Sequence, residues 1–177
     1  MTNTKPKRYS PLWVSLHWLI ALLLGAIFIL GFSTRNASFE TYPIIINWHM
    51  FLGSLVLLLM LVRIIIRSRS PRPEPASAGH PLLDTIGVAT HHLLYTLAIL
   101  MPLTGMILAL SYNLTSLPLP APPALISRWI PAVHFWTAIG LGLLIALHVG
   151  AAFYHQFLRK DNLLARMWYG PGEGKKN

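Results

Sequence analysis

The 177-residue sequence contains no cysteine. Disulfide bonds, iron–sulfur clusters with thiolate ligands and the C-x-x-C-H attachment of haem are therefore excluded. A metal or a haem in this chain must be held by nitrogen, oxygen or methionine sulfur, with no covalent link to the protein. The sequence also has no glycine-rich phosphate loop and no internal repeat.

Charged residues are scarce as well, at 11% of the chain, whereas soluble domains carry about 25%. Hydrophobic residues make up 54%. They concentrate in four stretches of at least about 20 residues, long enough to cross a membrane as helices. These stretches are Leu12–Phe32, Ile44–Ile66, Thr85–Ser111 and Ala132–Phe157. The sequence therefore predicts an all-α fold: a transmembrane four-helix bundle running up, down, up and down, as a single domain over residues 1–177.

Acidic residues are especially few, with five Asp and Glu against fourteen Lys and Arg. In a four-pass topology, all but two of the basic residues fall on one side of the membrane: Lys5, Lys7, Arg8, Arg63, Arg67, Arg69, Arg72, Arg159, Lys160, Arg166, Lys175 and Lys176. Only Arg35 and Arg128 fall on the other side. Because cytoplasmic loops are enriched in Lys and Arg, both termini are expected in the cytoplasm. The net charge of +9 then reflects topology, and nucleic acid is not expected as a partner.

Proline positions predict helix ends. Pro11, Pro43 and Pro131 are expected at the starts of helices, where a missing N–H has no intrahelical partner to lose. Pro102 falls inside the third stretch and is expected to kink it. The proline-rich residues 112–131 are expected to drape over the outer end of the bundle.

Seven of the eight histidines lie in the apolar stretches. A buried polar ring is expensive in a membrane and is taken as functional by default. His134 and His148 are fourteen residues apart. On an α-helix this spacing returns to within about 40° of the starting direction after a climb of about 21 Å. The two rings therefore share one helix face at two depths.

Counting from the outer ends of the helices assigns each histidine a depth. His49 and His134 lie near the outer end, and His17 and His148 lie further in at a common level. Two cross-helix pairs at two depths are the arrangement that bis-imidazole haem ligation requires, with one ligand on each face of the iron. Zinc would require three or four ligands clustered at one depth.

Two further sets of residues fit this arrangement. Some glycines could leave room for flat macrocycles, or could serve only close helix packing; they are Gly25, Gly53, Gly140 and Gly142. Arg35 and Arg128 are candidate partners for haem propionates at the outer side, unless they are simply solvated.

The inner side carries a second candidate site. His91 and His155 lie closer to the cytoplasm than the inner histidine pair, and Arg67, Arg69 and Lys160 fall on the same side. Polar rings beside a haem suit a quinone, whose carbonyls need hydrogen-bond donors and whose reduction takes up protons. The alternative is that His91 and His155 anchor helix ends or bind haem propionates.

Several motifs in this order resemble the bacterial cytochrome b561 family of four-helix, di-haem, quinone-linked membrane proteins. They are "SLHW", "NWHMFLG", "LLLMLVRIIIRSRSP", "HHLLYTLAILMPLTG" and H-x13-H-x6-H followed by "KDNLLARM". The resemblance implies two haem b groups, with His17 and His148 binding the iron of the inner haem and His49 and His134 that of the outer haem. In a member that oxidises superoxide, ubiquinone lies near the positions of His91 and His155.

The chain departs from the family pattern at three positions. A second histidine, a threonine and an acidic residue of the family are replaced here by Gln156, Leu163 and Phe135. The resemblance still implies a bacterial inner-membrane enzyme that takes electrons from periplasmic superoxide and passes them to ubiquinone. The alternative is an electron-transfer subunit that receives electrons from a partner redox protein. A haem-free transporter is disfavoured because no helix is broken at mid-membrane by Gly and Pro together with charges.

The charge distribution predicts the orientation of the chain. A reporter fused after residue 115 is expected to be active outside the membrane, and one fused after residue 177 inside, because the basic residues gather on the side of the termini. Paired fusions to a periplasmic enzyme and a cytoplasmic fluorophore measure both positions. The reverse pattern of activity would contradict the predicted topology.

Overall fold

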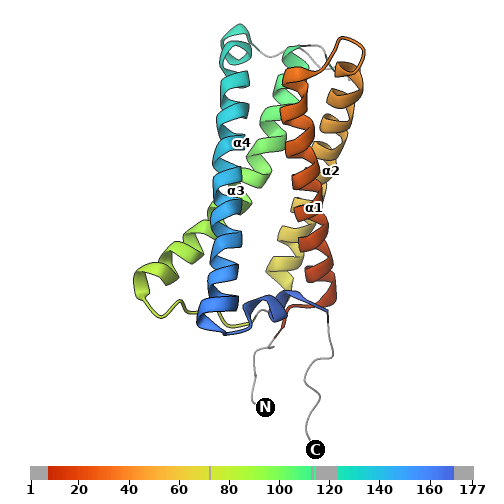
Figure 1. The fold of residues 1–177 in the computed structure, drawn as a ribbon. Helices are drawn as coiled ribbons and strands as arrows, with labels where there is room; N and C mark the ends of the chain where they lie inside the picture. The colour runs from red at the N-terminus through yellow and green to blue at the C-terminus, as the bar shows by residue number, and fades with distance from the viewer. Residues whose placement is uncertain (1–7, 72, 113, 115–122, 170–177) are drawn as a thin grey trace, which may run out of the picture.

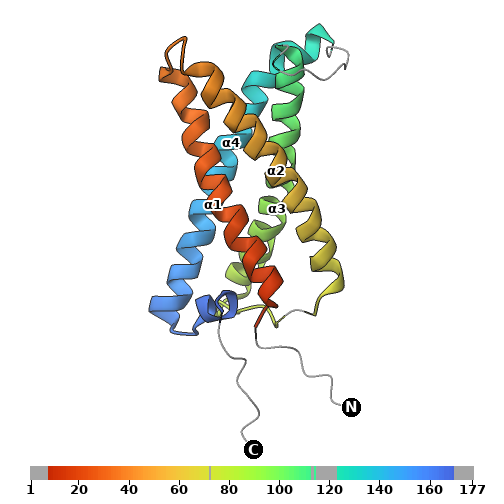
Figure 2. The same ribbon diagram turned by 90° about the vertical axis from the view of Figure 1, so that its right-hand side faces the viewer.

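The computed structural model describes residues 8–71, 73–112, 114 and 123–169. Four long helices make up most of these residues: α1 (Pro11–Ser33), α2 (Tyr42–Arg69), α3 (Pro81–Ser111) and α4 (Ala124–Phe153). They run alternately up and down in one bundle (Figures 1 and 2), and the described part of the chain contains no strand. The predicted all-α, four-helix architecture is confirmed.

The surface of the bundle suits a lipid environment. All four helices are long and apolar enough to cross a membrane. Large apolar side chains point outward, such as Leu22 at 73% and Leu143 at 67% exposure, while few are buried. An exposed apolar surface of this extent marks contact with an apolar medium. The chain is therefore a multi-pass membrane protein.

Two of the helices begin at the prolines that the sequence predicts as helix starts. Pro11 opens α1 behind Ser10, whose side chain accepts a hydrogen bond from the backbone N–H of Trp13, and Pro43 lies in the first turn of α2. Pro81 opens α3, four residues before the expected start. The earlier start follows from His80, whose ring nitrogen caps the helix by accepting from the N–H of Leu82 at 3.2 Å.

The fourth helix differs from the prediction at both ends. It begins at Ala124, so Pro131 lies inside the helix and the expectation that Pro131 starts it is wrong. An interior proline removes only one backbone hydrogen bond, which a membrane helix tolerates. Of the connection expected over 112–131, the structure therefore makes 124–131 helical; residues 113 and 115–122 lie outside the described part. At the other end, α4 passes at Phe153 into a π-helical turn, η2 (Tyr154–Arg159).

Packing in the bundle is uneven. Helix α1 packs along α2, α2 along α3, and α3 along α4, whereas α4 approaches α1 and α2 less closely. The buried cluster Ile20, Val56, Met60 and Ala98 joins α1, α2 and α3. Pro102 lies inside α3 as predicted, and the half of α3 before it leans outward from the bundle (Figure 1).

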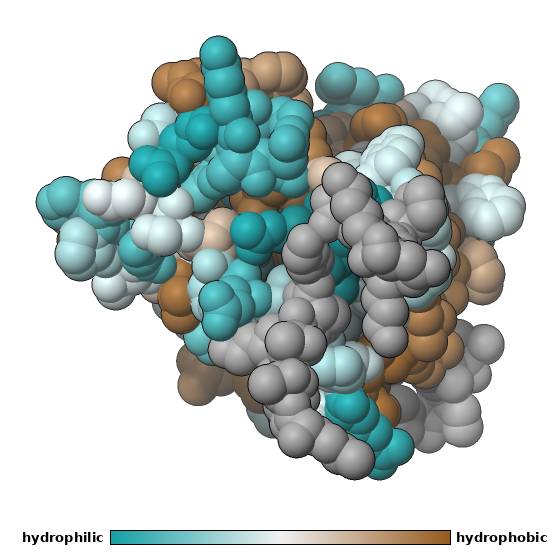
Figure 3. Space-filling view, turned by 90° about the horizontal axis from the view of Figure 1, so that it is seen from below, coloured by the Kyte–Doolittle hydropathy of each residue, from teal (hydrophilic) through white to brown (hydrophobic). Residues whose placement is uncertain are grey.

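We call the end where α1 begins and α2 ends the inner end. There the short helix η3 (Leu163–Met167) lies against the start of α1. The N–H of Tyr9 donates to the carbonyl of Arg166 at 3.2 Å, and the indole N–H of Trp18 donates to that of Met167 at 2.9 Å. Seen from this end, hydrophilic side chains gather toward one side of the molecule, and apolar side chains lie at its edges (Figure 3).

Candidate functional site

The structure brings the four histidines together as the depth count predicts. His17 on α1 faces His148 on α4, with ring centroids 6.2 Å apart. His49 on α2 faces His134 on α4, also with centroids 6.2 Å apart. All four side chains are half-buried between the helices. We call these the inner pair and the outer pair.

The spacing within each pair fits one metal ion between two rings. Metal–nitrogen bonds of about 2 Å on both sides of an ion place the centroids of two imidazoles about 6 Å apart. Among the described residues, no three His, Asp or Glu side chains gather into a metal site of the kind zinc requires. Two ligands per site leave the plane between the rings for a macrocycle.

Hydrogen bonds orient the rings of the outer pair. His49 Nδ1 lies 3.2 Å from the carbonyl oxygen of Ile27, which can only accept a hydrogen bond. His134 Nδ1 lies 3.0 Å from the hydroxyl of Thr104, whose own proton goes to the carbonyl of Met101 at 2.8 Å. Both Nδ1 atoms therefore carry the proton, which leaves the Nε2 lone pairs free to bind a metal.

Two glycines make room for the outer pair. A Cβ atom at Gly31 would lie 3.0 Å from Cε1 of His49, and one at Gly105 would lie 3.0 Å from Cε1 of His134. Sequence reasoning missed both positions. The signal was present, because Gly31 and Gly105 each lie fourteen residues after a histidine, His17 and His91, on the same helix face.

The glycines that the sequence did single out fall into two groups. A Cβ atom at Gly25 or Gly53 would meet no atom within 4 Å, so both border open space. Gly140 and Gly142 face Leu97 and Phe28 at 3.6 and 3.7 Å, which is ordinary packing contact. Of the four, Gly53 lies one turn from His49 and is the one best placed to border a macrocycle.

The inner pair has a charged neighbour that sequence reasoning also missed. Arg63 on α2 places Nη2 at 3.2 Å from Nδ1 of His17, and its Nε donates to the hydroxyl of Tyr95 at 3.0 Å. Arg67, expected on the quinone side, lies with its guanidinium 4.8 Å from the centroid of the same Tyr95 ring. Arg67 therefore shares Tyr95 as a partner with Arg63, the arginine that contacts His17.

His91 lies closer to the inner pair than the depth count predicts. Its ring stands edge-on to His148, with centroids 5.1 Å apart. The count assumed straight, parallel helices, but the half of α3 that carries His91 leans outward and gains less depth per residue (Figure 1). Among the described contacts, nothing joins His91 to His155.

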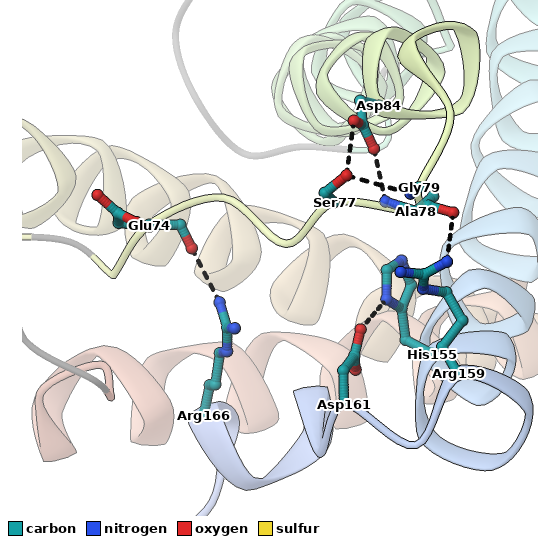
Figure 4. Close-up of polar contacts among 9 residues, drawn as sticks. All are labelled: Glu74, Ser77, Ala78, Gly79, Asp84, His155, Arg159, Asp161 and Arg166. Atoms are coloured by element: carbon teal, nitrogen blue, oxygen red, sulfur yellow. Dashed lines mark hydrogen bonds and ion pairs between the residues drawn. The ribbon is translucent and has the colours of Figure 1, made fainter.

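His155, which is buried, instead pairs with the partly exposed Asp161. Its Nδ1 lies 2.6 Å from Oδ2 of Asp161 (Figure 4). The flanking residues Lys160 and Asn162 have positive φ angles of 56° and 54°, a conformation uncommon for non-glycine residues. These two turns in the backbone bring the carboxylate back against the ring. A local strain of this kind is typical of functional segments.

The segment around this pair is tied to the connection between α2 and α3. Arg159 donates to the carbonyl of Ala78 at 2.9 Å, and Arg166 to that of Glu74 at 2.8 Å (Figure 4). Two buried oxygens, Oδ1 of Asp161 and Oε1 of Gln156, have no hydrogen-bond partner in the described structure. The remaining inner-side candidates, Arg69 and Lys160, are exposed at the same end.

The two outer arginines stack on aromatic rings. The guanidinium of Arg35 lies 5.4 Å from the ring centroid of Phe135, the residue after His134. Arg128 lies 5.8 Å from the ring of Trp129. Arg35 is therefore the outer cation whose aromatic partner adjoins a member of the outer pair.

Comparison with known proteins identifies the family. The family model described as prokaryotic cytochrome b561 matches residues 8–170. "Cytochrome b561 homolog 2" of Escherichia coli K12 is 27% identical over 94% of this chain and 93% of its own length. "Probable superoxide oxidase CybB" of Yersinia pestis is 30% identical (91% and 96%), and "Cytochrome b562" of Cereibacter sphaeroides is 29% identical (93% and 97%). The chain thus belongs to the prokaryotic cytochrome b561 family of bacterial membrane proteins, which bind b haem and transfer electrons.

Proposed function

We propose that this chain holds two b haems and carries electrons across the membrane from superoxide at the outer end to ubiquinone at the inner end. The observation that carries the proposal is the pairing of four histidines at two depths, each pair with centroids 6.2 Å apart. His17 and His148 are the axial ligands of the inner haem, and His49 and His134 those of the outer haem. A b haem held by each pair would supply one-electron transfer.

The protein fixes the ligands and keeps water out between the two levels. Ile27 and Thr104 hold the Nδ1 protons of His49 and His134, so that Nε2 of each ring is presented to the iron. Val56 and Leu141, each 1% exposed, lie seven residues along their helices from histidines of the pairs. These two buried apolar side chains lie between the levels of the inner pair and the outer pair.

Replacement of single ligands tests the haem assignment. Purified protein is expected to contain two haems per chain, both released by acid–acetone because no cysteine can form a thioether. His148→Ala is expected to lose the inner haem and keep much of the outer one, because only one axial ligand pair is broken. Haem quantitation with reduced-minus-oxidised spectra measures both. His92→Ala is the control, since this exposed ring bonds only to its own helix; a wild-type protein with one haem would contradict the assignment.

The ubiquinone site is placed at the inner end, at His155 and its neighbours. His155 bonds to Asp161 through Nδ1, so its Nε2 is free and, when the ring carries both protons, can donate to a quinone carbonyl. The unpartnered oxygens of Gln156 and Asp161 are acceptors that a quinol hydroxyl would satisfy. His91, Arg69 and Lys160 remain further candidates for this site. Two superoxide anions give up one electron each, and the quinone takes both electrons and two protons from the inner side.

Mutation of His155 tests whether this residue acts at the quinone site or binds a haem. His155→Ala is expected to slow quinone reduction about a hundredfold or more, the usual size of a lost proton donor, while both haem spectra stay close to those of the wild type. Stopped-flow oxidation of the prereduced protein by a water-soluble ubiquinone analogue measures this step. Loss of a haem in His155→Ala would make His155 an axial ligand and overturn the pairing.

Superoxide is the proposed donor for two reasons. A relative carries the name "Probable superoxide oxidase CybB", and superoxide made outside the membrane would reach the outer end of the bundle first. Superoxide is a small anion that crosses membranes poorly, so superoxide made outside must react outside. Arg35 and Arg128 against Glu40 leave the outer side with a formal charge of about +1, and steering by so few charges is modest. A partner redox protein as donor is the second candidate, on the grounds of the general electron-transfer role of the family.

One experiment decides between the two donors. Enzymatically generated superoxide is expected to reduce the oxidised protein with bound ubiquinone before the superoxide itself decays. Added superoxide dismutase should stop the reaction. His134→Ala is expected to abolish it, because the outer haem is lost. Raising the ionic strength should slow it only slightly, since few charges contribute. If superoxide leaves both haems oxidised while an added protein donor reduces them, the electron-transfer-subunit function is correct.

A further inference from the structure

Two arginines near the inner end of α2, Arg63 and Arg67, contact no negatively charged group among the described residues. Arg63 lies six residues before the end of α2, half-buried within the span. It contacts the hydroxyl of Tyr95, Nδ1 of His17 and, at 3.5 Å, the carbonyl of Trp13, none of which is negatively charged. Arg67 follows one turn later, and its guanidinium also lies over the Tyr95 ring, 4.8 Å from the centroid. Within the described residues, no carboxylate contacts either guanidinium, although a cation at membrane depth normally has an anionic partner.

The contact between Arg63 and His17 cannot persist when His17 binds a metal as a neutral ring. A guanidinium has only donors, so Nδ1 of His17 would have to accept. A neutral histidine that binds iron through Nε2 carries its proton on Nδ1 and cannot accept there. The outer pair shows the compatible arrangement, in which Ile27 and Thr104 offer acceptors to Nδ1. Arg63 therefore needs a different acceptor in the haem-bound protein, within reach of the His17 ring.

We propose that Arg63 and Arg67 form a carboxylate clamp that binds the propionates of the inner haem. Guanidinium groups bind carboxylates through paired, charge-assisted hydrogen bonds, and two arginines on successive turns of α2 match a group with two carboxylates. Both guanidiniums contact Tyr95, which helps to hold them near each other. The clamp rests on the inner haem proposed above. The phosphate headgroup of an anionic lipid offers similar acceptors, so the test distinguishes the two sources.

The test combines a mutation with a change in the haem itself. Protein made under haem starvation is loaded with haem b or with its dimethyl ester, in which both propionates are neutral, and the midpoint potential of the inner haem is measured by spectroelectrochemistry. With haem b, Arg63→Gln is expected to lower the ferrous-to-ferric ratio at a fixed potential about tenfold, which is about 59 mV for one electron. With the ester, the same mutation is expected to change little, because the coupled group is already absent.

Three other variants serve as comparisons. Arg67→Gln is expected to show the same dependence on free propionates. Arg63→Lys keeps the charge and is expected to keep most of the potential, so it remains informative if Arg63→Gln folds poorly. Ser68→Ala removes an exposed hydroxyl at the same helix end, which donates to the carbonyl of Ile65 on its own helix, and is expected to leave the potential unchanged with either haem.

Each contrary result has a distinct meaning. Equal shifts with haem b and with the ester would mean that Arg63 acts on His17 directly, and the clamp would be wrong. Loss of bound phospholipid from the arginine variants, without coupling to the propionates, would assign the site to a lipid headgroup and also overturn it. A wild-type protein without haem at the inner pair would refute the proposed function itself, before any arginine is changed.

Discussion

The need to satisfy imidazole rings between apolar helices governs most of what is specific in this structure. A polar ring in a membrane requires partners, and the chain supplies very few at these depths. It gives one acceptor each to His49 and His134, and it turns each ring toward a second ring. Gly31 and Gly105 are small because any side chain there would displace these rings. The helix surfaces around the rings thus carry small residues where the rings need space.

The same requirement explains the uneven packing of the bundle. Both pairs include a histidine of α4, and their partners come from α1 and α2, the two helices that α4 approaches least closely. Helices that packed directly there would leave no space for a flat group between two rings. The bundle is instead held by contacts between helices adjacent in sequence, with the buried cluster of Ile20, Val56, Met60 and Ala98 at their junction. Close helix packing and the histidine pairs thus involve different pairs of helices.

Sequence reasoning succeeds here where the signal is periodic and fails where it depends on contacts distant in the chain. Helix number, topology and the two cross-helix histidine pairs follow from apolar length and residue spacing. The sequence places the start of α4 at Pro131, but membrane helices also tolerate proline in their interior, and α4 begins seven residues earlier at Ala124. The contact of His91 with His148 depends on the lean of α3, and the contact of His155 with Asp161 depends on a π turn and two positive φ angles. No regular spacing of residues in the sequence predicts any of these features.

The basic residues serve more than topology. Exposed arginines and lysines at the inner end account for the expected orientation without help from Arg63, which lies within the span. On insertion scales, a charge near the middle of a membrane helix costs about 3 kcal/mol, and less toward its ends. Orientation alone therefore gives no reason to keep a charge at this depth. The outer end carries only Arg35 and Arg128, both on aromatic rings. The deepest basic group of the inner side thus lies beside His17, a candidate iron ligand, where contacts rather than topology account for it.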